Sequence, residues 1–97
     1  MTETGRFDLA DVVELQRLFR LQWEETQNRF VLLYPEGMVQ LNQSAGEILK
    51  RCNGVASIAA IAEDLARTFN EPDLKEDVLQ FMEIANGKGW IRVKPRA

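Results

Sequence analysis

Residues 32–45 of this 97-residue chain read LLYPEGMVQLNQSA, a run that predicts two strands joined by a tight turn and followed by a helix. Pro35 fixes its own φ and Gly37 can adopt a positive φ, so the apolar runs on either side are expected to fold back on each other. Asn42 or Ser44 then offers a side-chain oxygen that can cap a helix. The chain is therefore expected to join a short antiparallel sheet directly to helices.

Another strand is expected upstream of this stretch. Apolar and polar residues alternate over residues 18–24, which is the pattern of a half-buried strand. A polar turn at residues 25–28 leads to the almost continuously apolar residues 29–34, so both faces of that strand are expected to be covered. Short links between the strands predict an antiparallel meander, with residues 29–34 in the centre and residues 38–41 at an edge.

Three helices are expected after the sheet. The first stops at Asn53-Gly54, where a left-handed residue can end a helix. Ser57 caps the second, and the short link Val55-Ala56 between the two predicts a helix-turn-helix shape. Asp73 caps the third helix, which extends to about Asn86.

The two ends of the chain carry weaker patterns. Residues 1–17 are expected to form an N-terminal arm, and residues 18–97 the main domain. A thin apolar stripe between residues 9 and 16 predicts a weak helix capped by Asp8, too short to be stable alone. Residues 90–93 are expected to add a short extended tail.

The third helix carries more apolar surface than an ordinary surface helix. Its apolar arc spans about 220°, against about 100° for the usual stripe, because Leu79 and Ile84 lie on opposite flanks. Either the helix is buried on several sides, or one side lines a groove against the edge strand, where an extended peptide can bind. The candidate peptide-binding residues are Met38, Val39, Gln40, Leu41, Leu74, Val78, Leu79, Phe81, Met82 and Ala85.

The composition excludes several functional classes. A hydrophobic content of 45% is enough for the modest core of one domain, and a net charge of −3 argues against binding a nucleic acid or an anionic membrane. Because the chain has no histidine and a single cysteine, Cys52, nucleophilic triads, zinc sites and intramolecular disulfides are excluded. We therefore expect a protein that is not an enzyme and holds no metal or cofactor. With neither a signal peptide nor a membrane span in the sequence, we expect it in the cytoplasm.

A series of short motifs runs through most of the chain. They are Leu33-Tyr34-Pro35-Glu36-Gly37, Leu41-Asn42 with Ser44-Ala45, Ile48-Leu49, Cys52-Asn53-Gly54, Ile61-Ala62 with Leu65, Asp77-Val78-Leu79 and Gly89-Trp90. Together they resemble the PqqD family, the peptide chaperones of pyrroloquinoline quinone biosynthesis, over about residues 18–93. The run from Tyr34 to Ala45 is the more specific part, whereas Asn53 stands where the family more often has Asp.

The resemblance implies an α+β, winged-helix-like fold, with a three-stranded antiparallel sheet followed by a three-helix bundle. It implies that residues 18–97 are a peptide-recognition domain of the kind found in ribosomal-peptide-modifying systems. Such a domain would bind the precursor peptide PqqA by strand addition and present it to the radical-SAM enzyme PqqE. The walls of the peptide groove would be residues 38–41 and 74–85.

Two other interpretations remain at this level. A winged-helix DNA-binding regulator shares the helix-turn-helix shape, but the helices are acidic and would repel phosphate. The acidic residues concerned are Glu63, Asp64, Glu76, Asp77 and Glu83. A small enzyme is disfavoured by the missing histidine. A homodimer, formed through the edge strand or by exchange of the arm, stays open.

Overall fold

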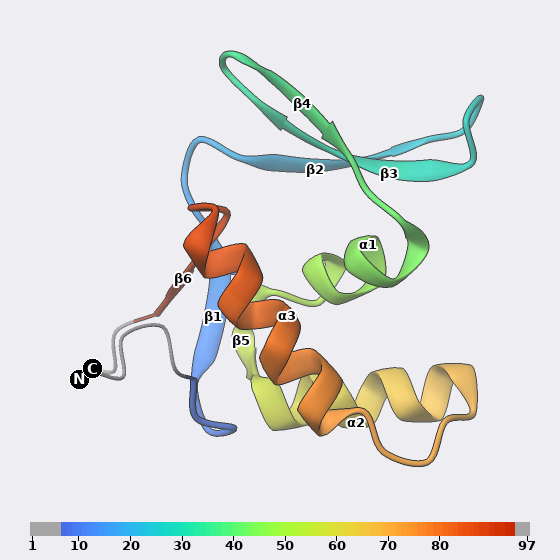
Figure 1. Ribbon diagram of the computed structural model, residues 1–97, viewed down its shortest axis with the longest axis vertical. Coiled ribbons are helices and arrows are strands. Elements are labelled where there is room, and N and C mark those ends of the chain that lie inside the picture. Colours follow the sequence, from blue (N-terminus) through green and yellow to red (C-terminus); the bar gives the residue numbers. More distant parts are fainter. Residues whose placement is uncertain (1–6, 95–97) are drawn as a thin grey trace.

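The computed structural model describes residues 7–94 and has an α+β fold with two small antiparallel sheets and three helices (Figure 1). The first sheet has the strand order β2-β3-β4 and the second the order β5-β1-β6. The strands are β1 (Val12–Leu15), β2 (Arg20–Glu24), β3 (Arg29–Tyr34), β4 (Gly37–Gln40), β5 (Asn53–Ser57) and β6 (Ile91–Val93). The helices are α1 (Gln43–Lys50), α2 (Ile58–Phe69) and α3 (Lys75–Gly87).

The β2-β3-β4 sheet is the predicted meander, with β3 in the centre and β4 at an edge. Both faces of β3 are covered, as predicted, because Val31 and its neighbour Leu32 point to opposite faces and both are buried. Leu32 belongs to the main core, whereas Val31 lies on the outer face of the sheet. The prediction of a positive φ at Gly37 is wrong, because Gly37 does not adopt one. The turn at Pro35-Glu36 closes without a positive φ there, and Gly37 is the first residue of β4.

The second sheet was not predicted from the sequence. Residues 12–15, expected to be helical, form β1 between β5 and β6, so the helix prediction is wrong. The segment is too short to be stable as a helix, and strand pairing on both sides buries Val13 instead. Asp8 accepts a hydrogen bond from the Ala10 N–H in a turn and caps no helix. Residues 1–6 of the expected arm lie outside the described residues.

The expected helix-turn-helix link is also wrong, because a strand separates α1 from α2. α1 ends at Lys50, and residues 53–57 form β5 against β1. The Asn53 Oδ1 accepts hydrogen bonds from the Val55 and Ala56 N–H groups, which turns the chain sharply. Gly54 does adopt a left-handed φ of 79°, but at a break in the β1–β5 register and not at a helix end. The winged-helix likeness stays a prediction.

The helix starts agree with the sequence in two cases out of three. The Asn42 Oδ1 caps α1 by accepting from the Ala45 N–H at 2.8 Å, and Ser57 caps α2 as predicted. The prediction that Asp73 caps α3 is wrong, because Leu74 occupies the N-cap position of that helix. Asp73 accepts from the Lys75 N–H two residues ahead, a local turn that competes with capping.

One hydrophobic core joins the inner face of the β2-β3-β4 sheet to the helices and the second sheet. Figure 1 shows the meander at the top of the molecule, and α1, α2, α3 and the second sheet lie below the meander. On α3 the residues Val78, Met82 and Ala85 are buried, whereas Ile84 is 57% exposed. Among residues 7–94, no helix combines the length and apolar character that crossing a bilayer requires.

Candidate functional site

The free edge of β4 offers backbone groups for a further strand. The Leu41 N–H donates to the Phe30 C=O at 3.0 Å across the β3–β4 ladder. Because alternate residues of an antiparallel strand bond to the same neighbour, the N–H of Val39 also points to β3. The N–H and C=O groups of Met38 and Gln40 point away from β3, where the described residues supply no neighbouring strand. These four groups can pair with an extended peptide.

The side chains of β4 divide between the two faces of the sheet. Val39 packs against the core, whereas Met38 is 51% exposed on the outer face. Gln40 is fixed there, because its Oε1 accepts from the Arg29 Nη1 at 3.0 Å and its Nε2 donates to the Gln27 Oε1 at 3.3 Å. The outer face is therefore held in place by side-chain hydrogen bonds while the backbone edge stays open.

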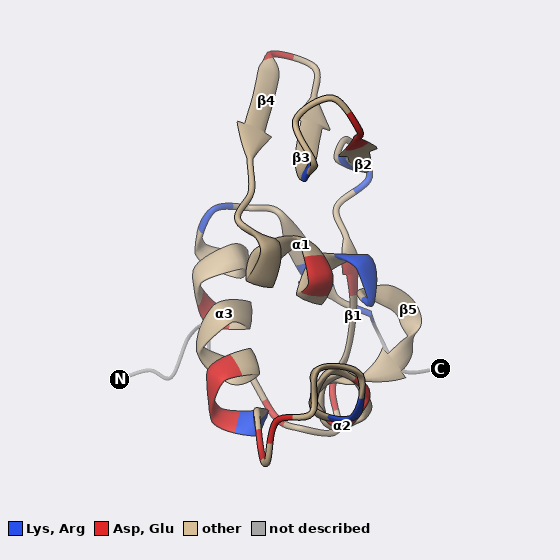
Figure 2. Ribbon diagram, turned by 90° about the vertical axis from the view of Figure 1, so that its right-hand side faces the viewer, with Lys and Arg blue, Asp and Glu red and all other residues tan. Residues whose placement is uncertain are grey.

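The remaining candidate residues, from Leu41 and from Leu74 to Ala85, fall into two groups. Leu74, Leu79 and Phe81 are half-buried and reach the surface. Four of the candidates have their side chains in the core: Leu41, Val78, Met82 and Ala85. Figure 2 shows β4 and α3 on the same side of the molecule, with β4 above α1 and most of α3 below it.

Two clefts border the start of α1, and neither was expected from the sequence. The larger has a volume of about 460 Å³ and lies between α1, α2 and α3, with Ile48, Leu65, Phe69, Leu74 and Val78 as its apolar lining. The smaller cleft, of about 280 Å³, lies near the β2–β3 turn and is lined in part by Trp23. The Trp23 ring packs edge-on against Phe30, with 4.9 Å between the two ring centroids. Gln43 borders both clefts, so they meet at the first residue of α1.

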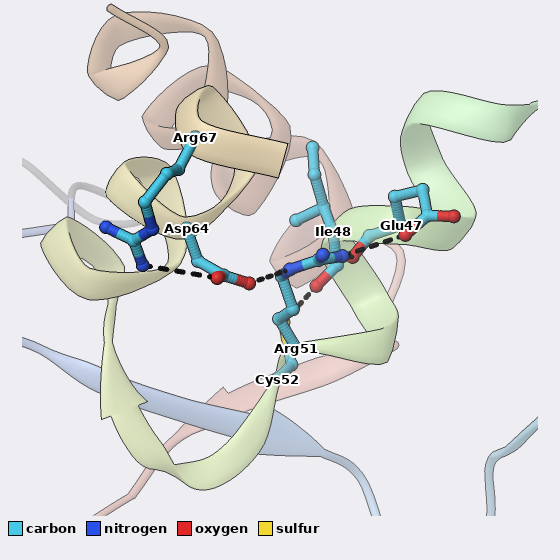
Figure 3. A network of polar contacts seen from close by, with 6 residues as sticks. All are labelled: Glu47, Ile48, Arg51, Cys52, Asp64 and Arg67. Carbon is cyan, nitrogen blue, oxygen red and sulfur yellow. Dashed lines mark hydrogen bonds and ion pairs between the residues drawn. The ribbon is translucent and has the colours of Figure 1, made fainter. Parts of the chain in front are cut away.

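A network of charged side chains ties α1 to α2 (Figure 3). The Arg51 Nε lies 2.6 Å from the Asp64 Oδ2, and its Nη1 lies 2.8 Å from the Glu47 Oε1. Arg67 adds a longer contact to Asp64 at 3.3 Å. Burial acts to lower the pKa of Arg51, but the hydrogen bonds to Asp64 and Glu47 outweigh it and the pKa is raised. Because this guanidinium stays charged, its ion pairs to Glu47 and Asp64 hold the two helices together.

We expect this network to make the stability of the fold depend on pH in acid. The hydrogen bond from Arg51 holds the pKa of the Asp64 carboxyl below its usual value. Its stabilising effect is therefore complete above the unfolded pKa of about 4 and is lost as the pH falls through the lower folded pKa. Urea unfolding from about pH 5 to about pH 3 should show a smaller loss of stability for Asp64→Asn than for the wild type.

Glu63→Gln is the matched control for Asp64→Asn. Glu63 is the adjacent carboxylate on α2, is exposed, and forms no ion pair with another residue of the described range. Its loss should leave the acid dependence as it is in the wild type. An acid dependence that is the same in all three proteins would contradict the role assigned to Asp64.

Cys52 lies in the core at the end of α1. Its Sγ donates to the Ile48 C=O at 3.3 Å, and burial raises the pKa of the thiol to about 12. The thiol therefore stays protonated near neutral pH and is a poor nucleophile or metal ligand. Within residues 7–94, no three side chains of the types that bind metals lie together in a group able to hold an ion.

Comparisons with known proteins agree with the sequence resemblance. Residues 29–91 match the family described as Coenzyme PQQ synthesis protein D (PqqD). A protein of Azotobacter vinelandii named PqqA binding protein is 51% identical over 94 residues, which are 96% of this chain and 99% of the relative. The PqqA binding protein of Methylococcus capsulatus is 43% identical over 81 residues, which are 84% of this chain and 87% of the relative.

The fold has a counterpart among solved structures. The solution NMR structure of the PqqD truncation of Methylobacterium extorquens PqqCD superposes with a TM-score of 0.78 and is 29% identical. The likeness covers 94% of this chain and 99% of that chain, which is described as a stand-alone recognition element for ribosomally synthesised and modified peptides. Because the family matches most of the chain and a relative is 51% identical over nearly its full length, this chain belongs to the PqqD family.

Proposed function

We propose that this chain is the peptide chaperone of pyrroloquinoline quinone biosynthesis that binds the precursor peptide PqqA. The observation that carries the proposal is the 51% identity, over nearly the whole of both chains, to a protein named for binding PqqA. The free edge of β4 supplies a physical means for that binding. The chain acts by binding alone, without a catalytic group of its own.

The peptide adds a strand to the β2-β3-β4 sheet along the outer side of β4. Its backbone pairs with the outward N–H and C=O groups of Met38 and Gln40, each bond contributing about 0.5–1.5 kcal/mol. These bonds give affinity without selecting side chains, so selection depends on the surfaces that the peptide crosses beside β4. The proposed binding surface includes the half-buried residues Leu74, at the N-cap of α3, and Leu79 and Phe81, on α3.

We propose that the bound peptide is then presented to the radical-SAM enzyme PqqE, which this mode of binding permits. A peptide held along one strand edge keeps the rest of its length free to enter a second protein while it stays bound. The chaperone thus orders part of the peptide and leaves the reacting part accessible. We place these steps in the cytoplasm.

Titration of isotope-labelled protein with a synthetic PqqA peptide tests the proposal. Changes in the backbone amide chemical shifts should concentrate in residues 37–41 and around Leu74, Leu79 and Phe81. The absence of shifts in a monomeric sample, at peptide concentrations well above the micromolar range, would overturn it. A sedimentation run on the same sample distinguishes that result from a homodimer whose interface covers β4.

A further inference from the structure

We propose that the cleft between α1, α2 and α3 holds an apolar side chain of the bound peptide, and that a lysine or arginine stands next to that side chain in the peptide. This inference rests on the proposed function and defines which peptide residues the protein selects.

The cleft has an apolar floor and an open aromatic wall. Ile48, Leu65 and Val78 form the floor as part of the core. Phe69, at the last position of α2, is 41% exposed. Leu74, at the N-cap of α3, also lines the cleft and is half-buried. A volume of about 460 Å³ lies within the range of pockets that bind ligands. An apolar side chain entering here would cover surface that now faces water.

The rim of the cleft is acidic and selects a cationic neighbour. Glu71 and Asp77 line it, and neither forms an ion pair with another residue of the described part of the chain. Residues 71–77 carry four carboxylates and one lysine, and Figure 2 shows acidic residues gathered before α3 and in its first turn. Asp77 also suits the positive end of the α3 dipole, but Glu71 lies in the loop and has no such role. Glu47, the third acidic residue at the cleft, is already paired with Arg51.

The cleft borders the start of α1, which follows β4 closely in the sequence. β4 ends at Gln40, and two residues separate it from α1, whose first residues, Gln43 and Ser44, line the cleft. An extended peptide advances about 3.3 Å per residue, so a few residues beyond the β4 edge reach the start of α1. Backbone pairing at β4 and side-chain capture in the cleft can therefore act on one continuous segment.

The test is a pair of charge reversals, Glu71→Lys at the rim and Glu63→Lys on the exposed surface of α2 outside the cleft. Both change the net charge equally, so an effect of net charge alone changes the affinity for PqqA peptide to a similar extent in the two variants. We expect Glu71→Lys to raise the Kd roughly fivefold at low salt and Glu63→Lys to raise it far less. Phe69→Ala should weaken binding as well, because it removes the aromatic wall.

A second arm identifies the peptide residue. Each lysine or arginine of the peptide is replaced by glutamate in turn, and one replacement should weaken binding to the wild type yet restore binding to Glu71→Lys. Equal effects of the two charge reversals, or a peptide without a basic residue beside an apolar one, would overturn the inference. If the wild type binds and only changes at the β4 edge reduce affinity, the cleft is not used and the proposed function stands. Failure of the wild type to bind overturns both.

Discussion

Replacing Gly46 with alanine is expected to destabilise the fold by about 1–3 kcal/mol. Gly46 lies within α1 where the helix crosses β3, and an added Cβ would meet Phe30 at 2.7 Å from its Cγ and 2.8 Å from its Cβ. Rotation of the ring cannot move the Phe30 Cβ, so α1 and β3 must separate. That cost exceeds the gain in helix propensity from glycine to alanine, which is about 1 kcal/mol. Urea unfolding of the two proteins measures the difference.

Gly87→Ala is the matched control, because it makes the same chemical change in another helix. An added Cβ at Gly87 meets nothing within 4 Å, and the φ of Gly87 is not positive. Here only the helix propensity acts, and because Gly87 is the last residue of α3, stability should rise by less than about 1 kcal/mol, the value for a helix-interior position. The two substitutions are therefore expected to have opposite signs. A rise in both would show that α1 does not approach β3 as closely as the structure has it.

The sheet that carries the candidate site could be predicted because each of its strands pairs with a strand next to it in the sequence. Residues 18–41 alternate or run apolar over strand lengths, and Pro35-Glu36 closes β3 onto β4. These patterns alone indicated that β3 is central and β4 an edge. The inner and outer positions along β4 needed one more fact, the Leu41–Phe30 hydrogen bond, because the sequence does not fix which residue pairs are hydrogen-bonded.

The second sheet could not be predicted because its strands are short and pair over long distances. Val12 of β1 pairs with Ser57 of β5, and Val13 pairs with Val93 of β6. Both partner strands of β1 are therefore far away in the sequence. The apolar residues of β1 fit a helical stripe as well as a strand over so few positions. Tertiary pairing decides between them, and it also converted the expected helix end at Asn53-Gly54 into the start of β5.

The larger cleft was hidden because it too depends on contacts between residues far apart in the sequence. Phe69 and Leu74 are close in sequence, but the start of α1, against which they form the larger cleft, lies about 25 residues earlier. The exposed aromatic at the end of α2 was the one signal available, and it also fits a core position of an amphipathic helix. On α3 the sequence showed a surplus of apolar residues without showing that Val78, Met82 and Ala85 fill the core.

Gln40→Pro is expected to reduce affinity for PqqA peptide roughly tenfold while the protein stays folded. The N–H of Gln40 points away from β3, so its loss breaks no hydrogen bond of the sheet. It does remove a donor to the added strand, and the proline ring obstructs the approach of the peptide backbone. Val39 is unsuitable for this test, because its N–H points to β3 and proline there would disrupt the meander itself.

Gln40→Ala separates the backbone effect from the side-chain effect. It removes the contacts to Arg29 and Gln27 but keeps the N–H, so affinity should stay close to that of the wild type. Met38→Pro removes the other outward N–H of β4 and should act like Gln40→Pro. Calorimetric titration of the three variants, with thermal unfolding to verify the fold, gives the comparison. Wild-type affinity in a folded Gln40→Pro and a folded Met38→Pro would rule out strand addition at β4, since no outward N–H on that edge would then be needed.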